Sequence, residues 1–430
     1  MNAFHLIGIG GVGMSALAET LLDHGARVSG SERFCDQGRA LPVLDILRNQ
    51  RINIVPQNGS GIHSNLTAVI TSSAIEADNP DVLAANRLGI PIKHRSSTLA
   101  NTLADKRLIA ITGTCGKSTI TAMLGHILEV AGLDPTVVNG AQCANWHTPK
   151  RTGAVLHGTG NLCIIEADES DRSLLNFHPE TALVSNASAD HFSLEDTNTL
   201  FDAFIAQVSG TVIDGRNDSE PLPEITAHDW ACSFEFRNQL ITLSQPGRHN
   251  AINAWQAARM AELLDVPPQT IAKALASFKG IKRRLETIGV RSDGVRVVDE
   301  YAHNPEKIRA TLETLKSRSA RTLALWRPHG YGPLEKMFED LSTMFTETLR
   351  PDDHLFLLPV FDAGGTASRT IKTEALQERL AASGVKAEWF PDHTAAIMRI
   401  SSLADAGDII VTMGARDPDL PETAKALCTF

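Results

Sequence analysis

The segment of this sequence that most directly indicates chemistry covers residues 113–119 and reads Gly-Thr-Cys-Gly-Lys-Ser-Thr. An apolar, strand-like run precedes it and a helical pattern follows it. Glycines let such a turn curl until successive N–H groups face one anion, and the following helix adds its positive end. A lysine here can reach the outer phosphates of a nucleotide, and a hydroxyl can bind Mg²⁺. We therefore predict an ATP and Mg²⁺ site formed by Gly113, Thr114, Cys115, Gly116, Lys117, Ser118 and Thr119.

This phosphate-binding loop is a shortened version of the full pattern, which would have glycine where the chain has Ile111. The alternative is a glycine-rich turn between a strand and a helix that binds nothing. Strand, loop, Lys-Ser pair and helix occur here in the order that nucleotide binding requires, and this order favours the functional interpretation.

A second glycine-rich turn, residues 8–14, follows a strand-like segment and contains the pattern G-x-G-x-x-G. The ordinary meaning of this pattern is a dinucleotide site, in which Glu32 could accept a hydrogen bond from a ribose hydroxyl. The same geometry can hold any diphosphate, so the turn could bind NAD or a nucleotide-diphosphate substrate. Tight packing of a helix on a strand, with no ligand, is the third interpretation.

Carboxylates follow a later strand-like run of the same block. Residues 166–171 read Glu-Ala-Asp-Glu-Ser-Asp and come directly after the apolar run 162–165. Open α/β sheets place their ligands at the C-terminal ends of the strands, so one of these carboxylates could hold Mg²⁺ opposite the loop hydroxyl. After the next strand comes Asp190-His191, whose imidazole could complete a metal site. A solvated acidic loop and a structural histidine are the alternatives.

Three further polar segments lie later in the chain. Residues 247–253 open a predicted helix and carry side-chain amides that match the edge of an adenine, or else Asn250 simply caps the helix. Residues 299–305 and 327–331 each follow a strand-like run. The only two tyrosines of the sequence lie in these two loops, which favours a binding site there.

Alternating strand-like and helix-like segments must position these residues. Residues 1–100 alternate in a way that predicts a parallel sheet of βαβ units. Further strands are predicted at 68–71, 162–165, 181–184, 241–243, 295–298, 322–326, 354–358 and 409–413. The chain is thus predicted to be an α/β protein of three domains: an N-terminal Rossmann-like domain at 1–104, a central P-loop ATPase domain with a parallel-rich sheet at 105–283, and a C-terminal Rossmann-like domain at 284–430.

Composition excludes several classes of protein. A chain of 430 residues is too long for one compact core. Its net charge of −10 argues against a nucleic-acid surface. Six cysteines without a C-x-x-C pair indicate reduced thiols, and neither a secretory signal nor a bilayer-spanning stretch is expected. We expect a cytoplasmic enzyme that is a monomer or weak dimer and has no nucleic-acid or membrane partner.

In their order along nearly the whole chain, these motifs resemble those of the Mur ligases, most closely the branch that joins L-alanine to UDP-N-acetylmuramate. The resemblance is carried by residues 8–18, 71–75, His94-Arg95, 113–119, 166–171, Asp190-His191, 247–250, 299–305, 327–329 and 413–417.

The resemblance implies ATP-dependent amide formation in peptidoglycan precursor synthesis. A carboxylate, with UDP-N-acetylmuramate as its expected carrier, would take the γ-phosphate of ATP to give an acyl phosphate, and the amine of an amino acid or peptide would then displace phosphate. The catalytic residues implied are Lys117, His191, His303 and Asp299, and the Mg²⁺ ligands are Ser118, Glu166 and His191. ATP would also contact His249, Asn250, Asn253 and Arg284. The substrates would contact Gly10, Gly11, Gly13, Met14, Ser72, Ser73, His94, Arg95, Tyr301, Arg327, His329 and Arg416.

The sequence departs from the family's motifs mainly on the acceptor side. In the phosphate loop, Cys115 and Ser118 replace a histidine and a threonine, and the serine keeps the hydroxyl. Residues 327–333 read Arg-Pro-His-Gly-Tyr-Gly-Pro where the family has Arg-Pro-His-Arg-Tyr-Thr-Arg, so two arginines are lost. Arg416 replaces the second glycine of the family's Gly-Ala-Gly-Asp. We therefore expect L-alanine to be a poor acceptor compared with some other amine.

Three other functions compete with this one. The first is a Mur-like ligase for a different acceptor or for a carboxylate outside peptidoglycan synthesis. The second is an NAD-dependent oxidoreductase built on the turn 8–14, which would leave the phosphate loop unexplained. The third is a non-catalytic nucleotide sensor, against which the presence of Lys117, Glu166 and His191 argues.

Overall fold

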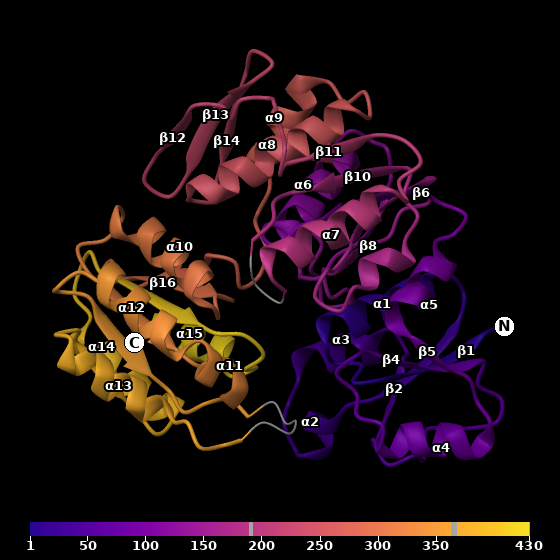
Figure 1. The fold of residues 1–430 in the computed structure, drawn as a ribbon, viewed down its shortest axis with the longest axis horizontal. Coiled ribbons are helices and arrows are strands. Elements are labelled where there is room, and N and C mark those ends of the chain that lie inside the picture. Colours follow the sequence, from indigo (N-terminus) through magenta and orange to yellow (C-terminus); the bar gives the residue numbers. More distant parts are fainter. Residues whose placement is uncertain (189–191, 363–367, 430) are drawn as a thin grey trace. The chain divides into compact units, whose positions relative to one another are not determined.

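The computed structural model of the protein describes residues 1–188, 192–362 and 368–429. Asp190 and His191, predicted near the metal, lie outside these described residues. The chain divides into two compact units, Met1–Ile281 and Lys282–Phe430, and each is built from helices packed on open sheets (Figure 1).

The first sheet of unit 1 has five parallel strands in the order β3-β2-β1-β4-β5. From β1 the chain runs outward to β3 and then returns to the other side of β1, so the strand order reverses between β1 and β4. Ligands of open α/β sheets bind at such a switch point, and the glycine-rich turn 8–14 follows β1 there. The strands are β1 Ala3–Ile7, β2 Arg27–Ser31, β3 Asn53–Val55, β4 Ala68–Thr71 and β5 Ile92–His94. The helices are α1 Val12–Asp23, α2 Arg33–Asp36, α3 Pro42–Asn49, α4 Pro80–Leu88 and α5 Arg95–Thr102.

The second sheet of unit 1 has six strands in the order β11-β10-β6-β9-β7-β8, all parallel except the short β8. Strand β6 lies between β10 and β9, so the loops that follow these three strands meet at one edge. The strands are β6 Arg107–Thr112, β7 Thr136–Val138, β8 Val155–Leu156, β9 Leu162–Glu166, β10 Thr181–Val184 and β11 Val212–Asp214. The helices of this region are α6 Lys117–Val130, η1 Ser173–Asn176, α7 Leu194–Ile205, α8 Arg248–Glu262 and α9 Pro268–Ala276.

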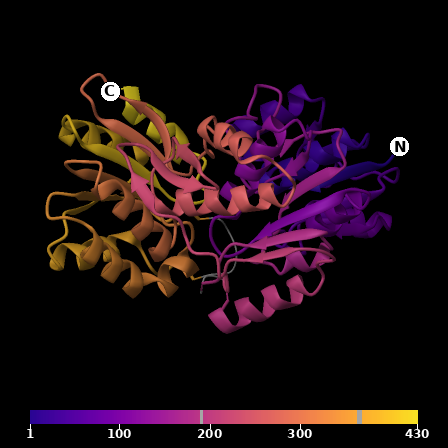
Figure 2. The same cartoon turned by 90° about the horizontal axis from the view of Figure 1, so that it is seen from above.

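A separate antiparallel sheet packs beside α8 and α9 and was not predicted (Figure 2). Its strands are β12 Ile225–Ala227, β13 Cys232–Phe236 and β14 Gln239–Leu243. The strand predicted at 241–243 is β14, and it belongs to this small sheet and not to the sheet that contains 162–165 and 181–184. Arg237 and Asn238 both adopt positive φ and form a tight two-residue hairpin, which pairs β14 with β13.

The N-terminal and central domains form one unit because they share apolar packing and buried polar contacts. Ala16 and Leu103 lie in the same hydrophobic cluster as Ile165 of the central sheet. Near the end of α1, Asp23 accepts two hydrogen bonds of 2.8 Å from Arg151.

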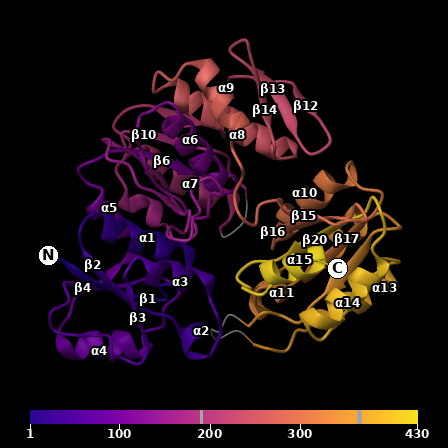
Figure 3. The same ribbon diagram turned by 180° about the vertical axis from the view of Figure 1, so that it is seen from behind.

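Unit 2 contains one sheet in the order β15-β16-β20-β17-β18-β19, parallel except for β15 (Figure 3). Glu300, Met413 and Trp326 are in register at the ends of β16, β20 and β17, so the loops after these strands share one edge. The strands are β15 Glu286–Val290, β16 Arg296–Glu300, β17 Thr322–Trp326, β18 His354–Leu357, β19 Ala387–Trp389 and β20 Ile409–Met413. The helices are α10 Pro305–Lys316, α11 Tyr331–Lys336, α12 Phe338–Thr348, α13 Thr373–Ala382, α14 His393–Leu403 and α15 Leu420–Thr429.

The mixed α/β architecture agrees with the predicted fold class. The strands predicted at 68–71, 181–184, 322–326 and 409–413 coincide with β4, β10, β17 and β20. In unit 2, the two edge strands, the antiparallel β15 and the three-residue β19, were not predicted. Within the described residues, no helix is long and apolar enough to cross a membrane.

Candidate active site

The phosphate loop is fixed in a conformation that leaves no room for side chains at its two glycines. Gly113 and Gly116 have φ of 127° and 88°, which other residues rarely adopt. A Cβ on Gly113 would collide with the hydroxyl of Ser185, and one on Gly116 would collide with the side chain of Asn253. The loop is therefore a tight concave turn that leads directly into α6 at Lys117.

Two residues after β10, which the sequence analysis did not assign to the site, hold this turn. The Asn186 side chain accepts a 3.0 Å hydrogen bond from the Cys115 N–H and donates one of 3.0 Å to the Cys115 carbonyl. The Ser185 hydroxyl donates to the same carbonyl at 2.6 Å. Their only signal in the sequence was their position after a predicted strand of the same sheet.

Lys117, the predicted catalytic lysine, is almost buried and charged. Its Nζ lies 2.7 Å from Glu169 Oε2 and donates 2.8 Å to the carbonyl of Gly113. Burial alone would lower the pKa of Lys117, but the carboxylates of Glu169, Asp168 and Glu166 outweigh this effect and raise it. The ammonium is therefore held at the mouth of the loop, where an incoming phosphate would compete with Glu169.

Burial has the opposite consequence for the partner carboxyl. It raises the pKa of Glu169 to about 7, although Lys117 acts to lower it. Only 5% of the Glu169 side chain is exposed, and removal from water favours the neutral carboxyl.

The predicted Mg²⁺ ligands Ser118 and Glu166 lie at the same edge of the sheet, because the first follows β6 and the second ends the adjacent β9. Glu166 Oε2 accepts a 2.7 Å hydrogen bond from the Gly140 N–H, and a Cβ at residue 140 would lie 2.5 Å from this oxygen. This contact orients the carboxylate. A hydroxyl and a carboxylate are hard oxygen donors of the kind that Mg²⁺ prefers, so the residues fit the ion.

The residues predicted to contact adenine differ in how far their side chains are already used. Asn253 lies against Gly116 at the start of α6. Asn250 is buried and donates a 2.8 Å hydrogen bond to the Pro246 carbonyl, so part of its amide is used within the protein. It does not cap α8, whose N-cap is Gly247. His249 is exposed on the first turn of the same helix.

The glycine-rich turn after β1, which is predicted to bind a diphosphate, has Gly10, Gly11 and Gly13 on its surface and Met14 buried behind it. Glu32 does not extend outward to a ribose, since its Oε2 accepts a 3.0 Å hydrogen bond from the Gly10 N–H. Its role here is to fix the turn.

The segment predicted to complete the donor site lies beside this turn. The Ser72 carbonyl accepts a hydrogen bond from the Ile75 N–H at 3.1 Å. The Ile75 side chain lies beside Gly8, where a Cβ would be 3.6 Å from it. Ser73 is exposed. His94 caps α5, with its ring accepting from the Ser96 N–H.

In unit 2, a cluster of rings forms where the loops after β16 and β17 meet. The rings of Tyr301 and His303 are edge to face at 5.6 Å, and those of His303 and His329 at 4.8 Å. His303 Nδ1 lies 2.9 Å from the Tyr301 carbonyl, which can only accept, so this nitrogen carries a proton. In the neutral ring the lone pair is then on Nε2.

Asp299 is placed beneath this cluster and faces the interior of unit 2. It is fully buried, lies 3.0 Å from Arg283 Nε and accepts a 2.7 Å hydrogen bond from Thr412. Its carboxylate therefore acts first on Arg283, whose guanidinium lies 5.1 Å from the Tyr301 ring centre. Arg284 lies 5.2 Å from the same ring and 4.0 Å from Glu300.

Arg327 is held by Asp417, which belongs to one of the motifs that carry the resemblance, and by His393, which was not predicted. Its Nη1 lies 2.6 Å from Asp417 Oδ2 and 2.8 Å from His393 Nε2, and its Nε donates to the Pro359 carbonyl at 3.1 Å. Burial would raise the pKa of Asp417, but His393 and Arg327 lower it to about 2.

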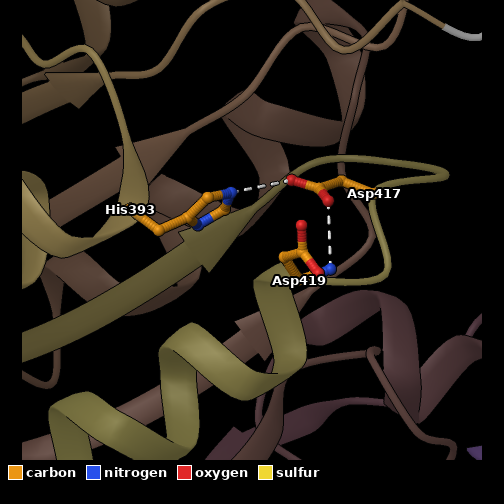
Figure 4. A group of neighbouring side chains, drawn as sticks. All are labelled: His393, Asp417 and Asp419. Carbon is orange, nitrogen blue, oxygen red and sulfur yellow. Dashed lines mark hydrogen bonds and ion pairs between the residues drawn. The ribbon is translucent and has the colours of Figure 1, made fainter. Parts of the chain in front are cut away.

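His393, Asp417 and Asp419 could on distance alone hold a metal ion. Figure 4 shows His393 and the Asp419 N–H bonded to the two oxygens of Asp417, at 3.2 Å and 3.0 Å. The Arg327 guanidinium already provides the cation at this cluster, so we assign the cluster to positioning Arg327.

Arg416 stands on the loop after β20, between the loops that carry the rings and Arg327. It is exposed and has φ of 64°, a left-handed conformation that glycine adopts without strain. In the described part of unit 2, Arg327, Arg283 and Arg284 all have carboxylate partners, whereas none is found for Arg416. The guanidinium is therefore available to a ligand.

Three family models match consecutive parts of the chain: the Mur ligase family catalytic domain over residues 3–107, the Mur ligase middle domain over 111–205, and the Mur ligase glutamate ligase domain over 283–416. The UDP-N-acetylmuramate–L-alanine ligase of Rhizobium meliloti (strain 1021) is 33% identical over 454 residues, covering 96% of this chain and 93% of that protein.

Solved structures give the same result for the fold. The UDP-N-acetylmuramate–alanine ligase MurC of Thermotoga maritima superposes with a TM-score of 0.81 at 23% identity, covering 99% of this chain and 98% of the other. A murein peptide ligase of Psychrobacter arcticus gives a TM-score of 0.67 at 22% identity, covering 99% and 98%.

We predict that Lys117→Ala lowers the rate of ATP turnover by about 10²-fold or more, because the ammonium would stabilise charge that develops on the phosphates. The fold should persist, since the Glu169 carboxyl can take up a proton once its cation is gone. A raised carboxyl pKa destabilises the fold only where the group is charged, so the loss of stability should be smaller at pH 6 than at pH 8. Turnover and thermal unfolding at both pH values provide the test. Lys106→Ala, which removes a lysine bound to the Gly160 carbonyl, is the control, and wild-type turnover in Lys117→Ala would refute the assignment.

We predict that Glu166→Gln and His191→Ala each raise the Mg²⁺ concentration that half-maximal ATP turnover requires, because each removes a predicted ligand of the ion. Titration of turnover with Mg²⁺ measures this. Glu180→Gln, at the opposite end of the sheet where Glu180 pairs with Arg107, should behave like the wild type. Unchanged Mg²⁺ dependence in both test variants would place the ion elsewhere.

Proposed function

The chain belongs to the Mur ligase family, and we propose that it joins the carboxylate of UDP-N-acetylmuramate to the amine of an amino acid or peptide. The reaction consumes ATP, passes through an acyl phosphate and forms a peptidoglycan precursor. The chain is an ATP-dependent ligase that forms amide bonds, as the family is.

One observation carries this proposal: the phosphate loop, Glu166 and the residues that hold the loop converge at one edge of the central sheet. The glycine-rich turn that suits a diphosphate lies in the same unit. An enzyme that phosphorylates a carboxylate on a nucleotide-diphosphate carrier requires both features, because two anions have to meet.

The residues of unit 1 suit the first half-reaction. Lys117 supplies a charge at the phosphates, and Ser118, Glu166 and His191 are the proposed ligands of Mg²⁺. When bound, the ion neutralises charge on the phosphates. The start of α6 suits the same anion, whereas the N–H groups of Thr114 and Cys115 donate to Asn186 and hold the loop.

The residues of unit 2 suit recognition of the amine. His303, with its Nδ1 proton fixed on the Tyr301 carbonyl, can present the Nε2 lone pair to an ammonium. His329 supports its ring from the side. Asp299 acts through Arg283 rather than by direct contact, so we propose it as a positioning residue.

The oxidoreductase alternative is weakened by Glu32, whose carboxylate is bound to the Gly10 N–H and not directed at a ribose. It also leaves the phosphate loop without a purpose. The Mg²⁺ requirement, the cytoplasmic location and the monomeric or weakly dimeric state remain predictions.

The proposed reaction predicts that ADP and phosphate are released only when a carboxylate donor and an acceptor are both present. The experiment is a matrix of UDP-sugar acids against amino acids and short peptides, with ADP release and product mass as readouts. ATP hydrolysis that ignores every acceptor, or no hydrolysis at all, would contradict a ligase and favour a nucleotide-sensing protein.

On the acceptor side, we propose that Arg416 anchors a carboxylate of the acceptor. Gly330 and Pro333 occupy the positions of two family arginines at the start of α11, so that anchor is absent. Arg416 supplies a guanidinium on the adjacent loop, and a guanidinium binds a carboxylate through two parallel hydrogen bonds. A non-glycine residue at positive φ costs on the order of 1 kcal/mol, so a functional reason for an arginine here is expected.

We predict that L-alanine is used poorly, or not at all, in comparison with the best acceptor of the matrix. Arg416→Ala should raise the KM for that acceptor by about tenfold or more, since it removes a charged contact with the ligand. The KM for ATP should not change. Arg309→Ala, which removes an arginine paired with Glu347 on the surface of α10, is the control. Efficient ligation of L-alanine that Arg416→Ala leaves unaffected would show the substitutions to be neutral.

A further inference from the structure

One cation of unit 1 lies between the glycine-rich turn and the acidic segment of the ATP site. Arg95 begins α5, and a Cβ on Gly13 would lie only 2.9 Å from its Nη1, so its guanidinium rests on the turn. Its Nη2 lies 3.7 Å from Asp168 Oδ2 and 3.6 Å from Asp171 Oδ2. Arg95 therefore links the proposed donor site to the segment that follows Glu166.

The two aspartates are fixed so that each directs one oxygen at Arg95. The other oxygen of Asp168 accepts a 3.1 Å hydrogen bond from the Ser170 N–H, and that of Asp171 accepts one of 3.0 Å from the Ser173 N–H. These local turns hold the carboxylates whether or not the guanidinium is present. The contacts to Arg95 are longer than hydrogen bonds, so they are ion pairs that another anion can replace.

Asp168 also faces the ATP site. Burial would raise the pKa of Asp168, but the charges of Lys117 and Arg95 lower it. Its carboxylate is thus shared between a cation of the phosphate loop and a cation of the donor site. Asp171 has its ion pairs with Arg95 and, at 3.8 Å, with His94.

The glycine-rich turn and the acidic segment line one small cavity together. A cavity of about 30 Å³ is lined by Gly13, Arg95, Glu166, Asp168 and Phe177, among others. That volume accommodates about one water molecule. A donor bound on the glycine-rich turn would bring its carboxylate toward Glu166 along this cavity, and Arg95 is the cation among the residues that line it.

We propose that Arg95 couples donor binding to Mg²⁺ binding, with Asp168 and Asp171 as the residues that position it. In the free enzyme the two aspartates hold the guanidinium. When the donor binds, one of its anionic oxygens pairs with the Arg95 guanidinium in place of the aspartates. The segment 166–171 then loses a neighbouring positive charge and binds Mg²⁺ more tightly. This inference rests on the proposed function of the two sites.

The coupling must act in both directions, because two equilibria that share a residue change each other's affinity by the same factor. Mg²⁺ bound beside Glu166 should favour the state in which Arg95 has left Asp168. Bound Mg²⁺ should therefore also strengthen binding of the donor. The donor's anion could be its diphosphate or its carboxylate, and both would attract a guanidinium.

The test measures binding of Mg²⁺ to the full chain with the non-hydrolysable nucleotide AMPPNP. The half-saturating Mg²⁺ concentration is determined without donor, with UDP-N-acetylglucosamine, which lacks the carboxylate, and with UDP-N-acetylmuramate. In the wild type, we expect a donor to lower this concentration by about fivefold. An effect of both sugars assigns the diphosphate as the partner of Arg95, and an effect of the acid alone assigns the carboxylate.

Two variants separate the proposed path from direct attraction between donor and ion. Asp168→Asn should abolish the effect of the donor on Mg²⁺, because the charge that Arg95 would release beside Glu166 is gone, although Asp171 still pairs with Arg95. Asp171→Asn removes a competitor for Arg95 and should lower the Kd of the donor by about two- to fivefold, the range of a partly exposed ion pair. Asp23→Asn is the matched control and should change neither quantity, because it removes the charge of an α1 residue that pairs with Arg151 and His157 of the central domain, away from Arg95.

An unchanged donor effect in Asp168→Asn, or a wild type in which donor and Mg²⁺ bind independently, would overturn the coupling and leave the ligase intact. A protein that binds neither AMPPNP nor either UDP-sugar would instead refute the proposed function. Thermal unfolding of each variant shows whether a change reflects loss of structure.

Discussion

The active edge of unit 1 depends on one steric constraint: the phosphate loop packs so closely against the end of β10 that residue 113 cannot carry a side chain. Ser185 and Asn186 occupy that space and bind both polar groups of the Cys115 peptide. The hydrogen-bonding capacity of the peptide at 115 is satisfied by the protein, so the loop keeps its shape without a ligand. A preformed anion site needs less reorganisation when the phosphates arrive.

At each proposed site, a cation is paired with at least one carboxylate. Lys117 has Glu169, Arg95 has two aspartates, and Arg327 has Asp417. A buried cation is stable only if a carboxylate accompanies it, because removing a charge from water is expensive. The pairs differ in their geometry: the contacts of Lys117 and Arg327 are shorter than 3 Å, whereas those of Arg95 exceed 3.5 Å. Only the ion pairs of Arg95 are loose enough to exchange partners readily.

Arg416 is the exception among these cations. It is exposed, has left-handed backbone geometry, and lacks the carboxylate partner that the neighbouring arginines of unit 2 have within the described residues. Its loop lies between two others because β20 lies between β16 and β17 in the sheet. The topology of the sheet thus brings the guanidinium of Arg416, a residue with left-handed backbone geometry, to the edge where the ring cluster of His303 and His329 lies. An anionic acceptor would neutralise it.

The sequence by itself determined the motifs, the parallel strands that carry them and hence the edges at which they meet. Residues 113–119 predict a phosphate loop because the spacing of the glycines, the lysine and the hydroxyl are local properties of the sequence. Strands such as 181–184 and 409–413 are predicted by continuous apolar runs. Tertiary structure alone decided the partners. Nothing local to Asp299 shows that it is buried against Arg283, and nothing local to Asp168 shows that it faces Arg95, 73 residues earlier in the chain. It also decided that 241–243 joins a separate hairpin sheet. Ion pairs and sheet membership depend on which segments the fold brings together, and a short sequence pattern carries no information about residues that are distant along the chain.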